Sequence, residues 1–207
     1  MEKKSWENVL ATQDFDITKL LAAIERNGAG SFKILQEDFR KKLLKESDYQ
    51  PFTFERDEII TKNNFVKQRV LSVDQFNVTG SFQVLARSFD DFLEEQLGVL
   101  SKYPFATRLK FNDFQLRKYP PGSVGISPHI DSAKFINLIC NFVLTGDGKF
   151  YISDDRFGRN MREIFSEPGS VVIMRAPGFM SSNKRPYHSV GVCETERISF
   201  GLRQMKD

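Results

Sequence analysis

From residue 108 to residue 204 the chain is a succession of short segments with the patterns of β-strands, separated by turns. The longest is the nearly continuous apolar run 135–144, which is typical of a strand in a sandwich core. Turns rich in Gly and Pro, at 120–122, 146–148 and 167–170, interrupt the sequence at regular intervals. About eight short strands with such turns predict a double-stranded β-helix, or jelly-roll, core over residues 108–204.

The first hundred residues carry mainly helical patterns. Apolar residues recur at the spacing of one helix face in three stretches: 17–27, 32–46 and 81–98. Asp16 is a suitable cap for the first of them, and Gly28 a suitable end. Segment 51–79 contains strand-like pieces at 52–54 and 65–71, which suit an edge of the main sheet. We predict a single α+β domain over residues 1–207, in which residues 1–100 give a mainly helical support packed on one face of the sheet.

Composition adds few constraints. With 40% hydrophobic and 28% charged residues, the chain has the make-up of an ordinary globular protein. Cys140 and Cys193 are too few for a disulfide framework, and we expect both to be reduced thiols. The N-terminus lacks the apolar core of a signal peptide, and no apolar run is as long as a membrane span. We therefore expect a cytoplasmic protein without membrane attachment, and nothing indicates an obligate protein partner.

The chain contains two histidines, and both fall in the strand-rich half. His129 stands two residues before Asp131, so both side chains point to one face if a strand runs into a turn there. His188 is the histidine left to join them from a neighbouring strand. Two imidazoles and one carboxylate are the ligand set of non-haem iron(II) oxygenases, and we predict that these residues bind iron(II). The structural alternative is a polar turn at His129 and a hydrogen-bonded core imidazole at His188.

A charged strand face begins nine positions after His188. The polar, turn-like residues 194–196 predict a β-hairpin that returns Arg197 beside the His188 strand. By the period of two, Arg197, Ser199 and Arg203 share one face of the second strand. Two guanidiniums and a hydroxyl are costly to bury without an anion, and the guanidinium fork matches a carboxylate. A dicarboxylate such as 2-oxoglutarate would satisfy them.

Together these motifs resemble the Fe(II)/2-oxoglutarate-dependent dioxygenase superfamily, over roughly residues 114–204. The last strand, Arg197-Ile-Ser-Phe-Gly-Leu-Arg203, is similar to the R-x-N-x-T-x-R pattern of the AlkB-like branch. Upstream, the segment that begins Tyr119-Pro-Pro-Gly is similar to the Y-x-P-G turn of that branch. The chain departs from the branch at three positions, where Ser199, Gly201 and Arg117 stand in place of Asn, Thr and Asn.

The resemblance implies a lid over the substrate as the alternative role of the strands in segment 51–79. It also implies a reaction and roles for the site residues. Iron(II), 2-oxoglutarate and O₂ would hydroxylate or oxidatively demethylate a C–H bond, with release of succinate and CO₂. Arg197 would pair with the distal carboxylate of 2-oxoglutarate, and Ser199 and Tyr119 would donate hydrogen bonds. Arg203 would reach the other carboxylate. The carboxylate of Asp131 argues against halogenation, because the halogenases of the superfamily leave room for a halide there.

The sequence leaves the substrate open. A small molecule or amino-acid-like metabolite is the leading interpretation. Alkylated nucleic-acid bases are the alternative, which needs a pocket for an extruded base and a basic track for phosphates; the net charge of +3 permits this. A non-enzymatic jelly-roll binding module is the alternative of another class. Seven polar residues lie in segments that could border the mouth of the barrel: Arg117, Lys134, Asp154, Asp155, Arg156, Arg175 and Asn183.

Overall fold

The computed structural model describes residues 4, 6–61, 64–73, 76 and 78–206. These residues form three helices, α1 (Ile17–Asn27), α2 (Glu37–Ser47) and α3 (Gly80–Gly98). They also form the strands β1 (Ala29–Lys33), β2 (Thr53–Phe54), β3 (Glu58–Thr61), β4 (Asn64–Lys67), β5 (Leu71–Val73), β6 (Asp113–Tyr119), β7 (Ile126–His129), β8 (Phe135–Thr145), β9 (Phe150–Ser153), β10 (Arg162–Ile164), β11 (Ser170–Arg175), β12 (Tyr187–Val190) and β13 (Arg197–Met205).

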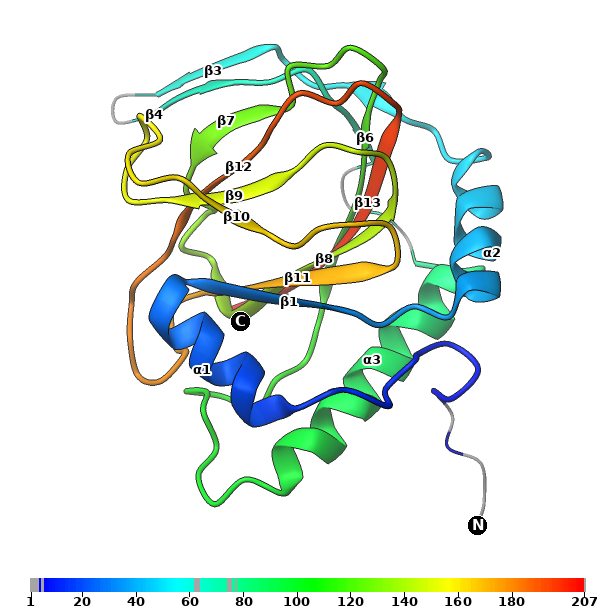
Figure 1. Ribbon diagram of the computed structural model, residues 1–207, viewed down its shortest axis with the longest axis vertical. Coiled ribbons are helices and arrows are strands. Elements are labelled where there is room, and N and C mark those ends of the chain that lie inside the picture. The colour runs from blue at the N-terminus through cyan, green and yellow to red at the C-terminus, as the bar shows by residue number, and fades with distance from the viewer. Residues whose placement is uncertain (1–3, 5, 62–63, 74–75, 77, 207) are drawn as a thin grey trace.

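The strands form two main antiparallel sheets that make up a jelly-roll (Figure 1). Within the described residues, the larger sheet has the order β1-β11-β8-β13-β6-β5-β2, and the smaller sheet has the order β10-β9-β12-β7. Strands β6 to β13, eight in all among the residues described, fall in the segment for which about eight were predicted. The predicted α+β class with a double-stranded β-helix core is confirmed.

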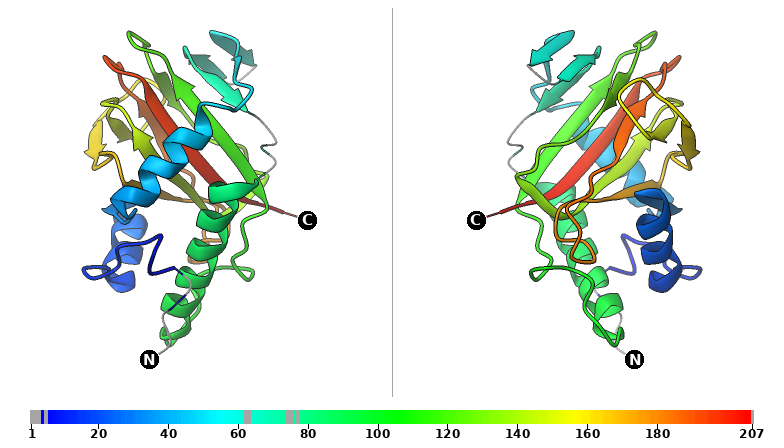
Figure 2. Two further views of the ribbon diagram at one scale, coloured as in Figure 1. Left: turned by 90° about the vertical axis from the view of Figure 1, so that its right-hand side faces the viewer. Right: turned by 90° about the vertical axis from the view of Figure 1, so that its left-hand side faces the viewer.

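The helices cover the outer face of the larger sheet, as the left view of Figure 2 shows for α2. On β13 this face carries Ile198, Phe200 and Leu202, which are all buried in the main hydrophobic core. The ring of Phe200 meets that of Phe82 on α3 edge-on, with 5.0 Å between the centroids. Burial of this face against helices leaves the opposite face of the same strands to line the interior of the jelly-roll.

The first helix agrees with its prediction, since Asp16 accepts hydrogen bonds from the backbone N–H groups of Thr18 and Lys19 at 3.0 and 3.1 Å. The second helix begins later than predicted, because the chain from Ala29 to Lys33 forms β1 and pairs with β11. The prediction for residues 32–36 is therefore wrong: backbone pairing with a buried strand outweighs the local helical pattern.

The strands within segment 51–79 belong to two different sheets. Strands β2 and β5 extend the larger sheet, whereas β3 and β4 form a separate hairpin. The hairpin lies beside β7, where the backbone N–H of Lys67 donates to Ser127 Oγ at 2.9 Å. One strand predicted from Phe65 to Leu71 is thus wrong, since the chain leaves the hairpin after β4 and joins another sheet at β5. Among the described residues, no helix is long and apolar enough to cross a membrane.

Asp90 on α3 should make the stability of the fold depend on pH. Burial raises the pKa of its carboxyl to about 7, although a hydrogen bond from the backbone of Phe111 opposes the shift. The folded state therefore holds a proton that the unfolded chain releases above its ordinary pKa of 3.8, so stability is lost as pH rises toward 7. We expect Asp90→Asn to raise the free energy of unfolding by on the order of 2 kcal/mol at pH 8 and to change it little at pH 4.

Urea unfolding of both proteins at the two pH values measures this difference. The exposed neighbour Asp91 supplies the matched control, Asp91→Asn, for which we expect no comparable gain at pH 8. A gain of equal size at both pH values would contradict the assignment of the effect to a buried, protonated carboxyl.

Candidate active site

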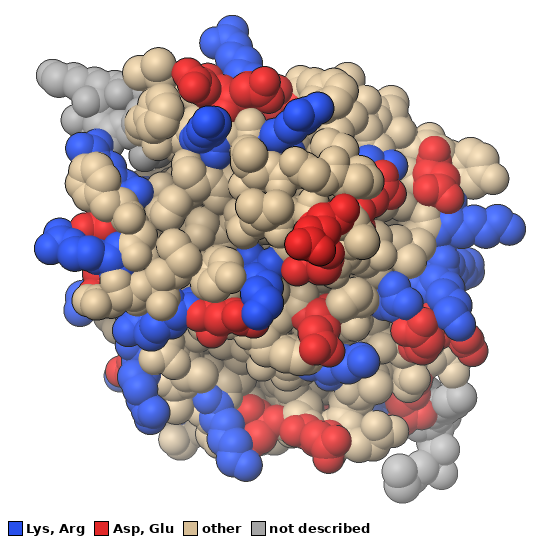
Figure 3. Space-filling model, turned by 45° about the horizontal axis from the view of Figure 1, so that its top comes forward, with Lys and Arg blue, Asp and Glu red and all other residues tan. Residues whose placement is uncertain are grey.

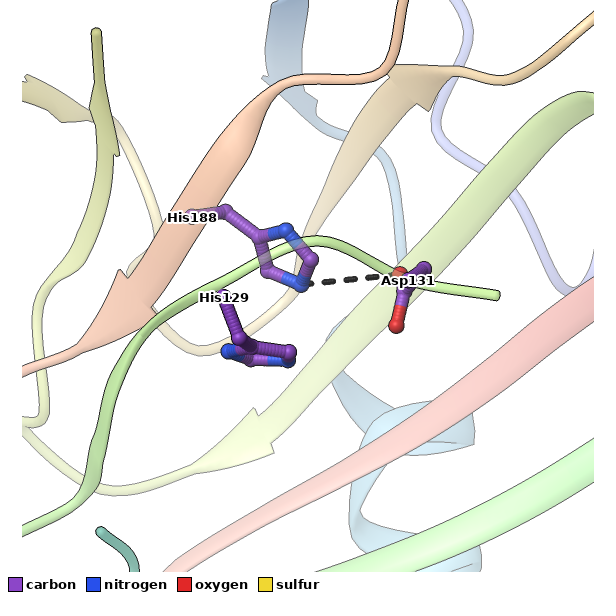
Figure 4. Close-up of side chains that lie close together, drawn as sticks. All are labelled: His129, Asp131 and His188. Carbon is purple, nitrogen blue, oxygen red and sulfur yellow. Dashed lines mark ion pairs between the residues drawn. The ribbon is translucent and has the colours of Figure 1, made fainter. Parts of the chain in front are cut away.

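The two histidines face each other across a pair of strands of the smaller sheet. His129 ends β7 and His188 lies on β12, and the two are direct partners in the antiparallel register. Asp131 follows two residues after β7, and one ligand atom from each of the three residues lies within 4.8 Å of the others. Figure 4 shows His188 Nε2 approaching Asp131 Oδ2, a distance of 3.5 Å. The structure thus brings together the three residues that the sequence singled out.

Backbone carbonyls fix how the two imidazoles are oriented. Nδ1 of His129 lies 2.9 Å from the carbonyl oxygen of Ser127, and Nδ1 of His188 lies 3.4 Å from that of Pro186. A carbonyl oxygen can only accept, so each Nδ1 carries a proton, and Nε2 is the nitrogen that a neutral ring can offer to a metal. The ring of His188 is also stacked on Phe150, with 5.6 Å between the centroids. Both rings are therefore held in the tautomer that binds a metal through Nε2.

The electrostatics favour the protonation states of metal ligands. Burial, followed by the charge of His188, lowers the pKa of His129 to about 3. Burial would raise the pKa of Asp131, but its interactions with His188 and His129, and then the charges of Arg117 and Arg203, lower it below its usual value. At neutral pH His129 is a neutral imidazole and Asp131 is a carboxylate, which are the forms that coordinate a metal ion.

Alternate residues of β6 and β13 form the opposite wall of the same cavity. Direct cross-strand pairs run along it: Tyr119 with Arg197, Arg117 with Ser199, Gln115 with Gly201 and Asp113 with Arg203. The cavity is lined by His129, Asp131 and His188 on one side and by Arg117, Tyr119, Arg197, Ser199 and Arg203 on the other. The predicted shared face of Arg197, Ser199 and Arg203 is present in the structure.

The way in which Arg197 reaches this cavity differs from the prediction. Strands β12 and β13 do not form a hairpin, because β12 belongs to the smaller sheet and β13 to the larger. In the connection, the backbone of Cys193 donates to Ser123 O at 3.0 Å and accepts from Gly122 N at 2.8 Å. These bonds to a distant loop replace those of a tight turn, so the chain crosses between the sheets. Arg197 therefore faces the histidines across the barrel interior.

Arg197 is a buried guanidinium without an acidic partner among the described residues. The residue is only 2% exposed, and its Nε donates to the carbonyl oxygen of Gly148 at 3.0 Å. A Cβ at Gly148 would lie 2.9 Å from Cδ of Arg197, so glycine is needed for this approach. The guanidinium carbon lies 5.8 Å from the centre of the Tyr119 ring. Burial lowers the pKa of Arg197, as expected for a cation removed from water, and a bound anion would offset that cost.

Arg203, at the other end of the face, already has partners. Its Nε lies 2.5 Å from Oδ2 of Asp113, and Nη1 donates to Oε1 of Gln115 at 3.1 Å. Sequence reasoning missed both partners, although the alternation of Asp113, Gln115, Arg117 and Tyr119 along one strand would have placed them on the same face. Of the seven polar residues expected near the mouth, Arg117 lines this cavity, while Arg175 lines a small adjoining one beside Asp131 and His188.

No protein-family model and no curated protein matches the chain. Several solved structures, however, align with the chain over most of its length. A prolyl hydroxylase from Trichoplax adhaerens, in complex with a hypoxia inducible factor peptide, aligns with a TM-score of 0.62 at 13% identity, over 94% of this chain and 96% of its own. The non-haem α-ketoglutarate-dependent epimerase SnoN from nogalamycin biosynthesis aligns with a TM-score of 0.64 at 15% identity, over 91% and 82%. The chain has the fold of the 2-oxoglutarate-dependent iron oxygenases.

This fold does not single out one branch of those oxygenases. The structure of OsALKBH1 aligns with a TM-score of 0.62 at 12% identity, over 86% of this chain and 99% of its own, which is no closer than the other two. The similarity therefore supports the superfamily fold that the sequence motifs resemble, and leaves the AlkB-like branch and the substrate undecided.

Proposed function

We propose that this protein is an Fe(II)- and 2-oxoglutarate-dependent dioxygenase that hydroxylates or oxidatively demethylates a C–H bond of a small-molecule or amino-acid-like substrate. One observation carries the proposal. The cluster of His129, Asp131 and His188 shares a cavity with Arg197, a buried guanidinium that has no acid beside it among the residues described. A metal-ligand set and an unpaired anion site in one cavity are what this reaction class needs.

The residues present fit the metal and the co-substrate. Two imidazoles and a carboxylate would hold iron(II) and leave room at the metal for other groups. Arg197 would bind the distal carboxylate of 2-oxoglutarate, with Ser199 and Tyr119 as hydrogen-bond donors to it. When bound there, iron(II) with 2-oxoglutarate and O₂ would supply the oxidation of the C–H bond, with succinate and CO₂ as the other products.

The chain's own contribution is positioning and exclusion of water. The carbonyls of Ser127 and Pro186 hold the ligand tautomers, and Gly148 aims the Arg197 side chain. Arg203, already paired with Asp113, would orient the second carboxylate of the co-substrate and contributes to keeping Asp131 ionised. The buried wall from Tyr119 to Ser199 limits access of solvent to the site.

An AlkB-like dealkylase of nucleic-acid bases is the second candidate, favoured by the last-strand motif of residues 197–203. The surface argues for the small-molecule substrate instead. Figure 3 shows the end of the molecule that carries the β3–β4 hairpin, and there Lys and Arg are interspersed with Asp and Glu. A protein that follows a phosphate backbone usually presents a continuous basic surface.

Succinate release tests the proposed function. The enzyme is incubated with Fe(II), 2-oxoglutarate and O₂, and with panels of amino acids, methylated nucleosides and oligonucleotides. We expect one of the amino acids or other small molecules to stimulate succinate formation. In a separate binding test, we expect the protein not to bind a single-stranded oligonucleotide even at low salt. Stimulation by alkylated oligonucleotides alone would favour the second candidate, and no succinate under any condition would refute the enzymatic proposal.

A further inference from the structure

Arg117 joins Arg197 and Arg203 on the interior face of the larger sheet. It lies on β6, where its cross-strand partners are Ser199 of β13 and Ser72 of β5. Strand β6 is one strand closer than β13, which carries Arg197, to the β2 edge of the sheet. Its side chain is 25% exposed and lines the cavity of the metal-ligand candidates. Arg117 is therefore more accessible from outside than Arg197, which is almost completely buried.

The ion pair of Arg117 is loose. Among the described residues its acidic partner is Glu55, and Nη2 of Arg117 lies 3.9 Å from Oε1 of Glu55, too far for a hydrogen bond. Nε of Arg117 and Oε1 of Glu55 are both buried without a hydrogen-bond partner in the described part of the chain. The other oxygen of Glu55 accepts from Nε2 of Gln68 at 2.9 Å. Buried groups left in this state call for a ligand.

The other two guanidiniums are accounted for. Arg203 contacts Asp113 at 2.5 Å, and Arg197 is assigned to the co-substrate. Arg117 also shares its cavity with the metal-ligand candidates, so a group bound to Arg117 would lie near them. The cavity thus has one more guanidinium than the iron site and 2-oxoglutarate require.

We propose that Arg117 binds a carboxylate of the substrate, so that the enzyme acts on a small carboxylic acid such as an amino acid. This inference rests on the proposed function and deepens it. The planar fork of a guanidinium matches a carboxylate, and the distant Glu55 keeps the charge partly compensated until substrate binds. A small anion that enters the cavity suits a side chain that is three-quarters shielded better than a nucleic-acid backbone does, since the latter follows exposed basic surfaces.

Calorimetry on the anaerobic Fe(II)·2-oxoglutarate protein tests the inference. The probes are the common L-amino acids and simple aliphatic carboxylic acids, each paired with its primary amide. For wild type we expect at least one acid to bind about 10- to 100-fold more tightly than its amide, the usual gain for a charge-assisted hydrogen bond. In Arg117→Gln this preference should fall to within about twofold, and Arg117→Lys should retain part of it because lysine keeps the charge without the fork.

The affinity for 2-oxoglutarate and the melting temperature serve as controls, and both should be nearly unchanged in the two variants. Three results would overturn the inference: no acid preferred over its amide by wild type, a preference that persists in Arg117→Gln, or a loss of 2-oxoglutarate affinity in that variant. If Arg117→Gln fails to fold, the comparison of Arg117→Lys with wild type decides. A wild-type protein that binds neither Fe(II) nor 2-oxoglutarate would instead refute the proposed function, so the two failures are distinguishable.

Discussion

Replacing Asp131 by alanine is expected to abolish tight Fe(II) binding and to lower 2-oxoglutarate turnover by about a thousandfold or more. The reason is geometric: the three candidate ligands come from β7, β12 and the segment that follows β7, and removal of the carboxylate leaves two imidazoles without a negative charge to offset the metal. Replacing His188 by alanine should have the same effect, because it removes a ligand of the opposite strand. Anaerobic calorimetry with Fe(II), and succinate formation in air, measure the two quantities.

The matched control removes a carboxylate elsewhere. Asp38 is exposed in the first turn of α2, on the outside of the larger sheet, and Asp38→Ala should bind Fe(II) as the wild-type protein does. Thermal unfolding of each variant separates loss of the site from loss of the fold. Fe(II) affinity within a fewfold of wild type in both Asp131→Ala and His188→Ala would show that these residues do not hold the metal.

Arg197→Gln is expected to weaken 2-oxoglutarate binding by about 100-fold while Fe(II) still binds. Glutamine has no charge and no fork, yet it can still donate to the carbonyl of Gly148, so the wall of the cavity should persist. Arg197→Lys should give an intermediate loss, because the ammonium keeps the charge but cannot bind a carboxylate with two parallel hydrogen bonds.

The dissociation constant for 2-oxoglutarate, measured by anaerobic calorimetry on the Fe(II)-loaded protein, gives the comparison. Arg87 is exposed on α3, and Arg87→Gln provides the matched loss of a guanidinium away from the cavity. An unchanged dissociation constant in Arg197→Gln would remove Arg197 from the co-substrate site. An equal loss in Arg87→Gln would trace the effect to net charge alone.

The sequence predicted the parts of the site that depend on local periodicity. Alternation along a strand placed Arg197, Ser199 and Arg203 on one face, and the two-residue spacing of His129 and Asp131 put both near one point. The same reasoning extends to Asp113 and Gln115, which were missed. These features need only the direction of successive side chains, and that direction is fixed once a segment is a strand.

The parts that failed depend on partners far away in the sequence. The polar residues 194–196 suit a hairpin turn, but the backbone of the preceding Cys193 bonds to residues 122–123, and the chain crosses to the other sheet. Likewise, residues 32 and 33 were predicted to begin a helix but belong to β1, which pairs with β11. Local propensity differs little between such alternatives, so tertiary pairing decides between them.

The central claim is that one ion and one keto-diacid meet in the cavity between His188 and Arg197. Anaerobic titration of the wild-type protein with Fe(II) and 2-oxoglutarate, followed by visible absorption, tests it most directly. We expect a weak charge-transfer band that needs both components, saturates at about one equivalent of Fe(II), and is absent in His188→Ala. A wild-type protein that develops no band, or a band that is unchanged in His188→Ala, would show that the ion and the keto-diacid do not meet there.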